Sequence, residues 1–327
     1  MVTSRFESDF QDQPQAVVSQ LSSSTRPCLF NLIVISYDLE RALYCQELVR
    51  IITERFPCRI LFVRAEKETG YDVLRQTLST QYVGADNSTI VCDLLTIEAS
   101  SKQLERVPYL IIPNIVPDLP VYVVVADDPT QDSSILQQLE QLAARIIFGT
   151  PHIDNMSRFA GSIRKLLTCN GKQFVDIHWA RSKGWREVLA KVFADPEKLE
   201  ALQTASNANI VFTAPPGHET NRYEPQVLYT QAWIASQCGW KLEKIEGPRS
   251  TPTITYTTKT GTIKVALGVL DSAILDHGAL WSLEVTGSSG HHFLISHERT
   301  ARHVIVHASS AERCEIPYTI FMTNYQR

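Results

Sequence analysis

Hydrophobic and polar positions in the first half of the chain alternate between short apolar runs and longer amphipathic segments. Residues 28–35 form an apolar run of strand length, which is typical of a strand covered on both faces. Asp38 stands where a helix N-cap is expected, and apolar residues from Leu39 to Phe56 then recur three or four positions apart. Because the next apolar run follows at residues 59–63, this order predicts a βαβ unit.

The alternation of strands and helices continues to about residue 167. Residues 70–86 are ambiguous, because they fit either a helix or an antiparallel pair of strands. The later elements are strands near 89–97, 121–125 and 145–148 and helices near 133–144 and 153–167. Such alternation favours a mostly parallel, doubly wound sheet with helices on both faces. We therefore expect a Rossmann-like α/β domain over residues 25–172, preceded by a polar, flexible arm at residues 1–24.

The pattern changes at about Asp176. Two helices and a strand are expected first, near 182–193, 225–238 and 208–213. Short alternating runs separated by turn residues follow, near 253–258, 262–267, 281–285, 291–297 and 302–307. Runs of this kind are typical of an antiparallel sheet. Residues 173–327 are therefore predicted to form an α+β domain with an antiparallel sheet.

The composition is that of a globular protein without a nucleic-acid or membrane surface. Hydrophobic residues make up 44% of the 327 residues and charged residues 20%, with a net charge of −4 and no block of like charge. The seven cysteines include no C-x-x-C pair, which is typical of reduced thiols in the cytoplasm. The first residues lack an export signal, and prolines and an aspartate interrupt the apolar run at residues 109–126. We therefore expect a cytoplasmic protein that binds neither nucleic acid nor membrane.

A doubly wound sheet invites comparison with nucleotide-binding enzymes, whose first strand ends in a glycine-rich turn. Glycine lets backbone N–H groups approach a phosphate, but the corresponding turn here, residues 36–39, contains no glycine and carries Asp38. The G-x-G-x-x-G, phosphate-loop and G-x-S-x-G patterns are all absent from the sequence. The sequence therefore predicts no cofactor, no catalytic residue and no enzyme activity. The alternative is an enzyme or sensor that binds a sugar phosphate or nucleotide at the carboxyl edge of the parallel sheet.

Five of the nine histidines lie close together near the end of the chain. A four-residue hairpin loop at residues 298–301 would pair Ser296 with His303. It would also pair His292 with His307 and place two imidazoles side by side. Two imidazoles without a third ligand do not make a zinc site, so surface or half-buried histidines are the main interpretation. Metal binding or pH sensing is the alternative.

Three cysteines are candidates for redox chemistry. Cys28, Cys58 and Cys92 each neighbour a predicted strand, so two of these thiols could approach one another across the sheet. A disulfide demands a specific geometry that spacing alone does not provide. Cys45 differs, because it lies on the apolar stripe of the first helix and is expected in the core.

Four separated segments resemble one known family. Residues 176–189 match D-[LI]-x-W-x-R followed by W-R-x-x-L, which resembles the signature of the glucose-6-phosphate dehydrogenase assembly protein (OpcA) family. Residues 26–32 are similar to its R-x-C-x-x-N-L opening, and residues 117–121 to its P-D-L-P-V segment. Residues 232–240 are similar to its G-W-L-A-S-x-L-G-W segment. The segments occur in the family's order and span about two thirds of the chain.

This resemblance implies a non-catalytic protein that binds glucose-6-phosphate dehydrogenase, the entry enzyme of the oxidative pentose phosphate pathway. It implies an allosteric activator in carbohydrate metabolism that promotes the active oligomer of that enzyme. The residues that the resemblance marks for the partner interface or the family motif are Asp118, Trp179, Arg181, Trp185, Arg186, Trp233 and Trp240.

Two adjacent motif residues are expected to have different roles. On the helix predicted at residues 182–193, Trp185 lies near the middle of the apolar stripe, so we expect it in the core. Arg186 lies at the flank of that stripe, where a solvent-facing guanidinium could contact a partner carboxylate. We therefore expect Trp185 to serve the fold. Arg186 is a candidate interface residue, and the alternative is an exposed arginine without a specific contact.

Overall fold

The structure, a computed structural model, divides into two compact units, the first ending at Asp176 and the second beginning at Ile177. Each unit contains one eight-stranded sheet. Within the described residues, no helix has both the length and the apolar character needed to span a membrane. The structure describes residues 4–9, 28–66, 72–83, 90–128, 134–149, 159–165, 173–214, 224–271, 275, 277–287, 290–298 and 303–322.

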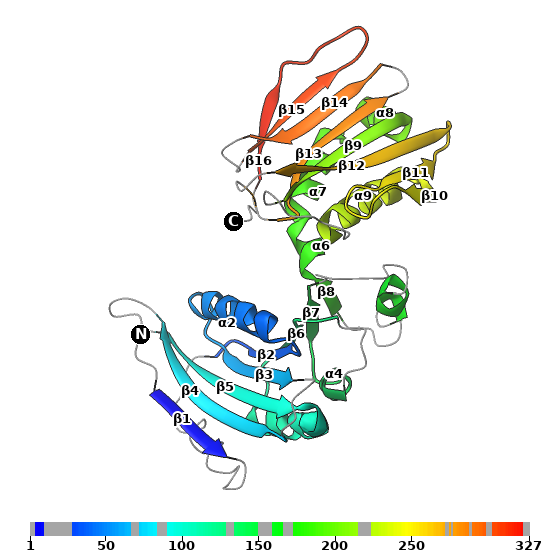
Figure 1. The fold of residues 1–327 in the computed structure, drawn as a ribbon. Coiled ribbons are helices and arrows are strands. Elements are labelled where there is room, and N and C mark those ends of the chain that lie inside the picture. Colours follow the sequence, from blue (N-terminus) through cyan, green and yellow to red (C-terminus); the bar gives the residue numbers. More distant parts are fainter. Residues whose placement is uncertain are drawn as a thin grey trace. The chain divides into compact units, whose positions relative to one another are not determined.

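The first sheet has a parallel centre and an antiparallel edge (Figure 1). In spatial order its strands are β1 (Ser4–Asp9), β4 (Leu74–Val83), β5 (Ile90–Ser100), β3 (Arg59–Glu66), β2 (Asn31–Ser36), β6 (Val121–Val125), β7 (Arg145–Phe148) and β8 (Gln173–Asp176). Neighbours from β5 to β8 run parallel, whereas β4 is antiparallel to both β1 and β5. The order reverses between β2 and β6, as in a doubly wound sheet.

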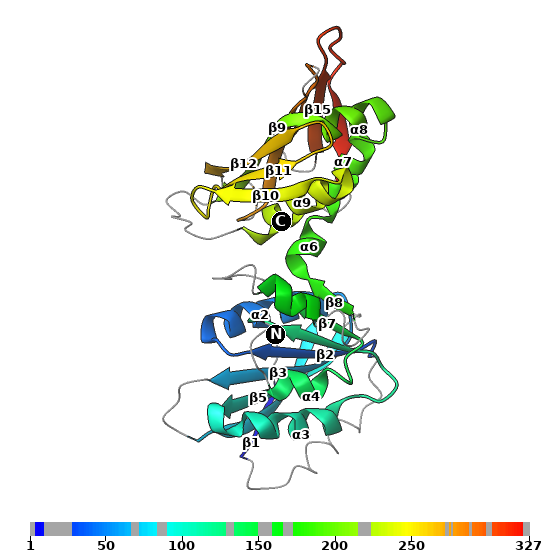
Figure 2. The same cartoon turned by 90° about the vertical axis from the view of Figure 1, so that its right-hand side faces the viewer.

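Helices cover both faces of this sheet (Figure 2). The helical elements are α2 (Leu39–Thr53), η1 (Ser101–Arg106), α3 (Val107–Ile111), η2 (Ile112–Asn114) and α4 (Ser134–Leu139), and residues 159–165 are also helical. Helix α2 begins after Asp38, whose carboxylate accepts a hydrogen bond from a backbone N–H of the first turn at 2.9 Å. Its buried side chains, including Cys45 and Val49, pack on one face, which agrees with the fully buried β2. The predicted Rossmann-like α/β fold is confirmed.

The edge strand β1 differs from the prediction of a flexible arm. Its pairing with β4 depends on backbone hydrogen bonds, which a polar sequence does not reveal; the rest of the arm lies outside the described residues. Strand β4 resolves the ambiguous segment 70–86 in favour of an antiparallel strand. Strand β8 lies in the first sheet, so four residues that the sequence analysis assigned to the second domain belong to the first unit.

The second sheet is mostly antiparallel, and its helices lie on one face (Figure 1). In spatial order its strands are β10 (Lys241–Glu246), β11 (Thr253–Thr257), β12 (Thr262–Asp271), β9 (Ala205–Ala214), β13 (Leu280–Gly287), β14 (His292–His297), β15 (His303–Ser309) and β16 (Tyr318–Phe321). Strands β9 and β12 pair parallel, and the other neighbours pair antiparallel. The helices are α6 (Ile177–Arg181), α7 (Lys183–Val192), α8 (Pro196–Gln203) and α9 (Pro225–Cys238). The predicted antiparallel sheet is confirmed.

The register of the histidine-rich hairpin differs from the prediction. Leu294 pairs with His307, and His292 lies opposite Ser309. Strand β14 ends at His297 and β15 begins at His303, so the connection is one residue longer than the predicted loop. The two imidazoles are therefore not directly opposite each other, and His292 instead bonds Glu284 of β13 at 2.8 Å.

Candidate functional site

The chain segment that leaves β8 places an aromatic ring and a guanidinium at the surface of the second unit. Ser182, between α6 and α7, donates a hydrogen bond to the Trp179 carbonyl at 2.8 Å. Arg186 on α7 donates to the same carbonyl at 3.1 Å, and its guanidinium carbon lies 3.5 Å from the centroid of the Trp179 ring. A cation stacked on an indole is a favourable contact. Trp179 is nevertheless 37% exposed, so the stacked pair is presented to solvent.

Helix α9 adds a third ring to this pair. Tyr229 meets Trp179 edge to face, with ring centroids 6.5 Å apart and planes at 85°. Trp179, Arg186 and Tyr229 are called the Trp179 cluster below. Burial lowers the pKa of Arg186, and its Nε has no hydrogen-bond partner among the described residues. The guanidinium expected to face solvent is therefore partly desolvated against an indole, although it keeps its charge at neutral pH.

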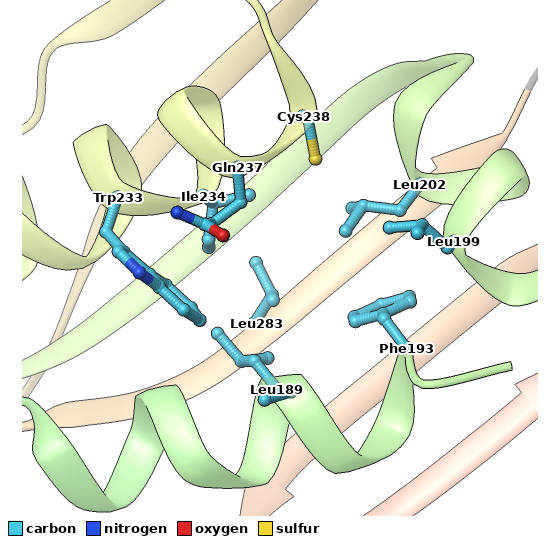
Figure 3. Close-up of a pocket in the computed structure, with 10 residues that line it drawn as sticks. Leu189, Phe193, Leu199, Leu202, Trp233, Ile234, Gln237, Cys238 and Leu283 are labelled. Atoms are coloured by element: carbon cyan, nitrogen blue, oxygen red, sulfur yellow. The ribbon is translucent and has the colours of Figure 1, made fainter. Parts of the chain in front are cut away.

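An apolar pocket lies between α7 and α9 (Figure 3), next to the Trp179 cluster. Its cavity has a volume of about 180 Å³. Helices α7 and α9 form its two walls, α8 closes one end, and β13 lies beneath it. Its lining is formed by Leu189, Ala190, Phe193, Leu199, Leu202, Trp233, Ile234, Gln237, Cys238 and Leu283. The Gln237 amide is the principal polar group in an otherwise apolar lining, so the pocket suits an apolar group.

The other tryptophans of the family motifs have structural positions. Trp185 is 2% exposed, and its indole N–H donates to the Leu280 carbonyl at 3.0 Å. Trp240 is also buried, and its N–H donates to the Gln203 carbonyl at 3.3 Å. Arg181 differs, because it ends α6 and is partly exposed. Trp185 therefore occupies the core position predicted for it.

Asp118 lies in the first unit, in an exposed turn before β6. Its φ of 65° is left-handed, a conformation that Asp tolerates better than most residues. Buried Asn31 holds this turn, because its side chain accepts from the Val116 N–H at 2.8 Å and donates to the Val116 carbonyl at 3.1 Å and the Leu119 carbonyl at 3.4 Å. Two of the four family segments thus meet at the amino edge of the first sheet, where they stabilise a turn.

The three candidate redox cysteines gather at that same edge. The parallel register that pairs Ile60 with Leu94 brings Cys58, just before β3, beside Cys92 on β5. A thiol–thiol hydrogen bond with Cys92 and burial both raise the pKa of Cys58. Burial also raises the pKa of Cys28, whose thiol donates to the Phe30 carbonyl at 3.3 Å. None of the three forms a disulfide in this structure, and the raised pKa values of Cys28 and Cys58 keep these two thiols predominantly protonated at neutral pH.

The crevice at the carboxyl ends of β2 and β6 is where doubly wound sheets bind nucleotides. Here the Tyr37 N–H donates to the Asp127 carboxylate at 2.7 Å. The Arg41 guanidinium donates to the Ala126 carbonyl at 2.8 Å and lies 3.9 Å from Asp127. A bound phosphate would have to displace this carboxylate and would also meet Asp38. Within the described ranges, no group of three metal-ligating side chains occurs here or elsewhere.

Sequence reasoning missed Tyr229 and the pocket. Tyr229 stands four residues before Trp233 on α9, a spacing that places both on one helical face. This spacing was the available signal. The pocket left none, because it depends on how far α7 and α9 stand apart.

Two family models cover most of the chain. The model described as "Glucose-6-phosphate dehydrogenase subunit N-terminal domain" matches residues 49–165, and the corresponding "C-terminal domain" model matches residues 172–313. The chain is 25% identical over 186 residues to an OxPP cycle protein OpcA from Synechocystis sp., covering 56% of this chain and 38% of that protein. A second OpcA, from Synechococcus elongatus, is 23% identical, with coverages of 59% and 42%. The chain spans about two fifths of the length of these curated relatives.

Solved structures resemble this chain only in fold. An oxidoreductase from Sinorhizobium meliloti is 8% identical, with a TM-score of 0.49 over 91% of this chain and 79% of that chain. An oxidoreductase from Parabacteroides merdae is 10% identical, with a TM-score of 0.48 over 88% and 78%.

Proposed function

This chain belongs to the glucose-6-phosphate dehydrogenase assembly protein (OpcA) family, and we propose that it binds glucose-6-phosphate dehydrogenase through the Trp179 cluster. In this proposal the chain promotes the active oligomer of the enzyme and has no catalytic activity of its own. The carrying observation is the exposed Trp179 ring, which contacts the guanidinium of Arg186 and meets the Tyr229 ring edge to face.

The chemistry of the cluster supports a protein partner. Tryptophan, tyrosine and arginine are the residues most enriched among the energetically dominant positions of protein interfaces. Side chains that are already fixed lose little conformational entropy when a partner binds. Arg186 stacks on the Trp179 ring and donates a hydrogen bond to the Trp179 backbone carbonyl, so this surface is preorganised for association.

The crevice of the first sheet supports the absence of catalysis. Its turn has no glycine, and the Tyr37 N–H already donates to Asp127, so a phosphate has no free backbone donor at that position. An assembly role needs no such site. A protein that binds the active oligomer more tightly than the inactive form raises the active population by that difference in affinity.

The test is a titration of this chain with the glucose-6-phosphate dehydrogenase of its host, with specific activity measured in parallel. We expect a complex, a rise in NADPH production, and no NADPH production by this chain alone. Arg186→Glu should weaken binding by roughly 2 kcal/mol, about 30-fold, if Arg186 is a dominant contact. Its free energy of unfolding should fall by no more than about 2 kcal/mol, because a cation–π contact contributes about 0.5–1 kcal/mol at an exposed site and about 2 kcal/mol when it is desolvated.

Arg249→Glu is the matched control, because Arg249 is an exposed arginine in the connection between β10 and β11. It should bind like the parent. Failure of the parent chain to bind or to raise activity would refute the proposed function. Parent-like affinity of Arg186→Glu would move the interface away from the Trp179 cluster.

A further inference from the structure

The apolar pocket continues directly from the Trp179 cluster. On α9, Trp233 of the pocket follows Tyr229 of the cluster by four residues. On α7, Leu189 of the pocket follows Arg186 by three residues. Residues three or four apart are neighbours on a helix surface. A partner that covers the Trp179 cluster would therefore also reach the mouth of the pocket.

The size of the pocket limits what can enter it. Its cavity of about 180 Å³ is slightly larger than an engineered apolar cavity of about 150 Å³ that holds benzene. One phenylalanine or leucine side chain fits this space, and a charged group would lose its hydration there without a partner. Gln237 of α9 is among the residues that line the pocket (Figure 3) and is exposed, so a larger residue at this position would occupy the opening of the pocket.

The charges differ between the two ends of the pocket. Helix α8, at one end, carries Glu197 and Glu200 with Lys198, whereas the helices beside the Trp179 cluster are mainly basic and favour an acidic partner on that side. Helix α9 has no charged residue. Helices α6 and α7 together carry four basic side chains and one acidic side chain, namely Arg181, Lys183, Arg186, Lys191 and Glu187. A second copy of this chain that used the same surface would bring these cations face to face, which disfavours a symmetric dimer here.

We infer that the pocket receives one large apolar side chain from an acidic segment of the dehydrogenase, whose carboxylate contacts the cations of α6 and α7. This inference rests on the proposed function and specifies the partner group at that surface. The apolar side chain supplies desolvated contact area, and the carboxylate fixes the orientation of the segment.

The test compares three tryptophan substitutions in titrations with the dehydrogenase. Gln237→Trp fills the pocket from α9, and Ala190→Trp fills it from α7. Ser236→Trp is the control, because Ser236 is exposed on α9 and does not line the pocket. We expect both filling variants to bind roughly 30-fold more weakly, the size of a dominant contact, and the control to bind within about threefold of the parent. Raising the salt concentration should weaken binding of the parent.

The outcomes separate this inference from the proposed function. If the parent does not bind the dehydrogenase, the proposed function fails. If the parent binds and a folded filling variant binds as tightly as the parent, the pocket inference fails while the proposed function stands. Thermal unfolding shows whether each variant is folded. If Gln237→Trp is unfolded, Ala190→Trp provides the test. Sedimentation of this chain alone tests whether a second copy of the chain occupies the pocket instead. A dimer that Gln237→Trp abolishes would assign the pocket to the second copy and overturn the inference.

Discussion

Acidification should destabilise the second unit through one buried histidine. His297, at the end of β14, is 7% exposed. Its ring meets Trp185 edge to face at a centroid distance of 5.4 Å and lies 6.2 Å from Trp281. Burial lowers the pKa of His297 to about 4, although a hydrogen bond with the His303 backbone opposes this shift. Its Nδ1 has no hydrogen-bond partner among the described residues, so a proton there would be poorly accommodated.

The sign of the effect follows from the lowered pKa. Between its unfolded value of 6.5 and its folded value of about 4, His297 is protonated in the unfolded chain and neutral in the folded chain. Its contribution is therefore intact above pH 6.5 and is lost as the pH falls. The loss amounts to about 2 kcal/mol between about pH 7.5 and about pH 5, and to about 3 kcal/mol below both pKa values.

His297→Phe isolates the contribution of His297 to the pH dependence, because it keeps an aromatic ring beside Trp185 and Trp281 and removes the titrating group. Urea unfolding of parent and variant at both pH values gives the two free energies of unfolding. All five tryptophans lie in the second unit, so their fluorescence reports on its unfolding. Replacing exposed His307 of β15 by Phe is the control and should keep the parent's pH dependence. If His297→Phe loses as much stability as the parent between these pH values, the reasoning is refuted.

Three further predictions concern the core and the thiols. Trp185→Ala should lower the free energy of unfolding by roughly 3–5 kcal/mol, measured by the same urea titration, whereas a change near zero would contradict a core position. All seven cysteines should react with a thiol reagent after denaturation, and a reproducible count of five would reveal a disulfide. In the native chain, alkylation followed by mass spectrometry should find exposed Cys314 modified first and Cys58 last, because burial and the hydrogen bond with Cys92 both raise the pKa of Cys58. Cys45 and Cys238 should also react slowly, because burial raises their pKa to about 11.

The fold was predictable wherever burial left a clear pattern. Strand β6 and helix α9 were predicted at their observed bounds, because Pro120 directly precedes the strand and Pro225 is the first residue of the helix. Strand β10 was missed because all of its residues are exposed at a sheet edge, so no alternation marks it. Helix α8 was missed as well, because its short sequence has few buried residues. A strand held by backbone pairing alone, or a short helix with few buried residues, shows no clear hydrophobic periodicity in the sequence.

The candidate site was predictable only in part, because its geometry depends on packing between helices. The family segments identified Trp179 and Arg186, but the stacking of one on the other depends on the turn at Ser182. The meeting of Cys58 and Cys92 was foreseen as one of several pairings, and the parallel register then selected it. Tyr229 was not predicted, because its contact with Trp179 joins helices α6 and α9, which are far apart in the sequence.

The adjacent motif residues Trp185 and Arg186 have different roles, one in the core and one at the surface. Trp185 anchors α7 in the core through its contact with His297 and its bond to the Leu280 carbonyl. Arg186 is rotated about 100° around the helix, which brings its guanidinium onto Trp179. Helix α7 carries both Trp185 and Arg186, so the burial of Trp185 also fixes the position of Arg186 in the Trp179 cluster. A change at Trp185 therefore acts on partner binding through the stability of the second unit, whereas a change at Arg186 acts at the contact itself, so affinity measured well below the unfolding temperature distinguishes the two.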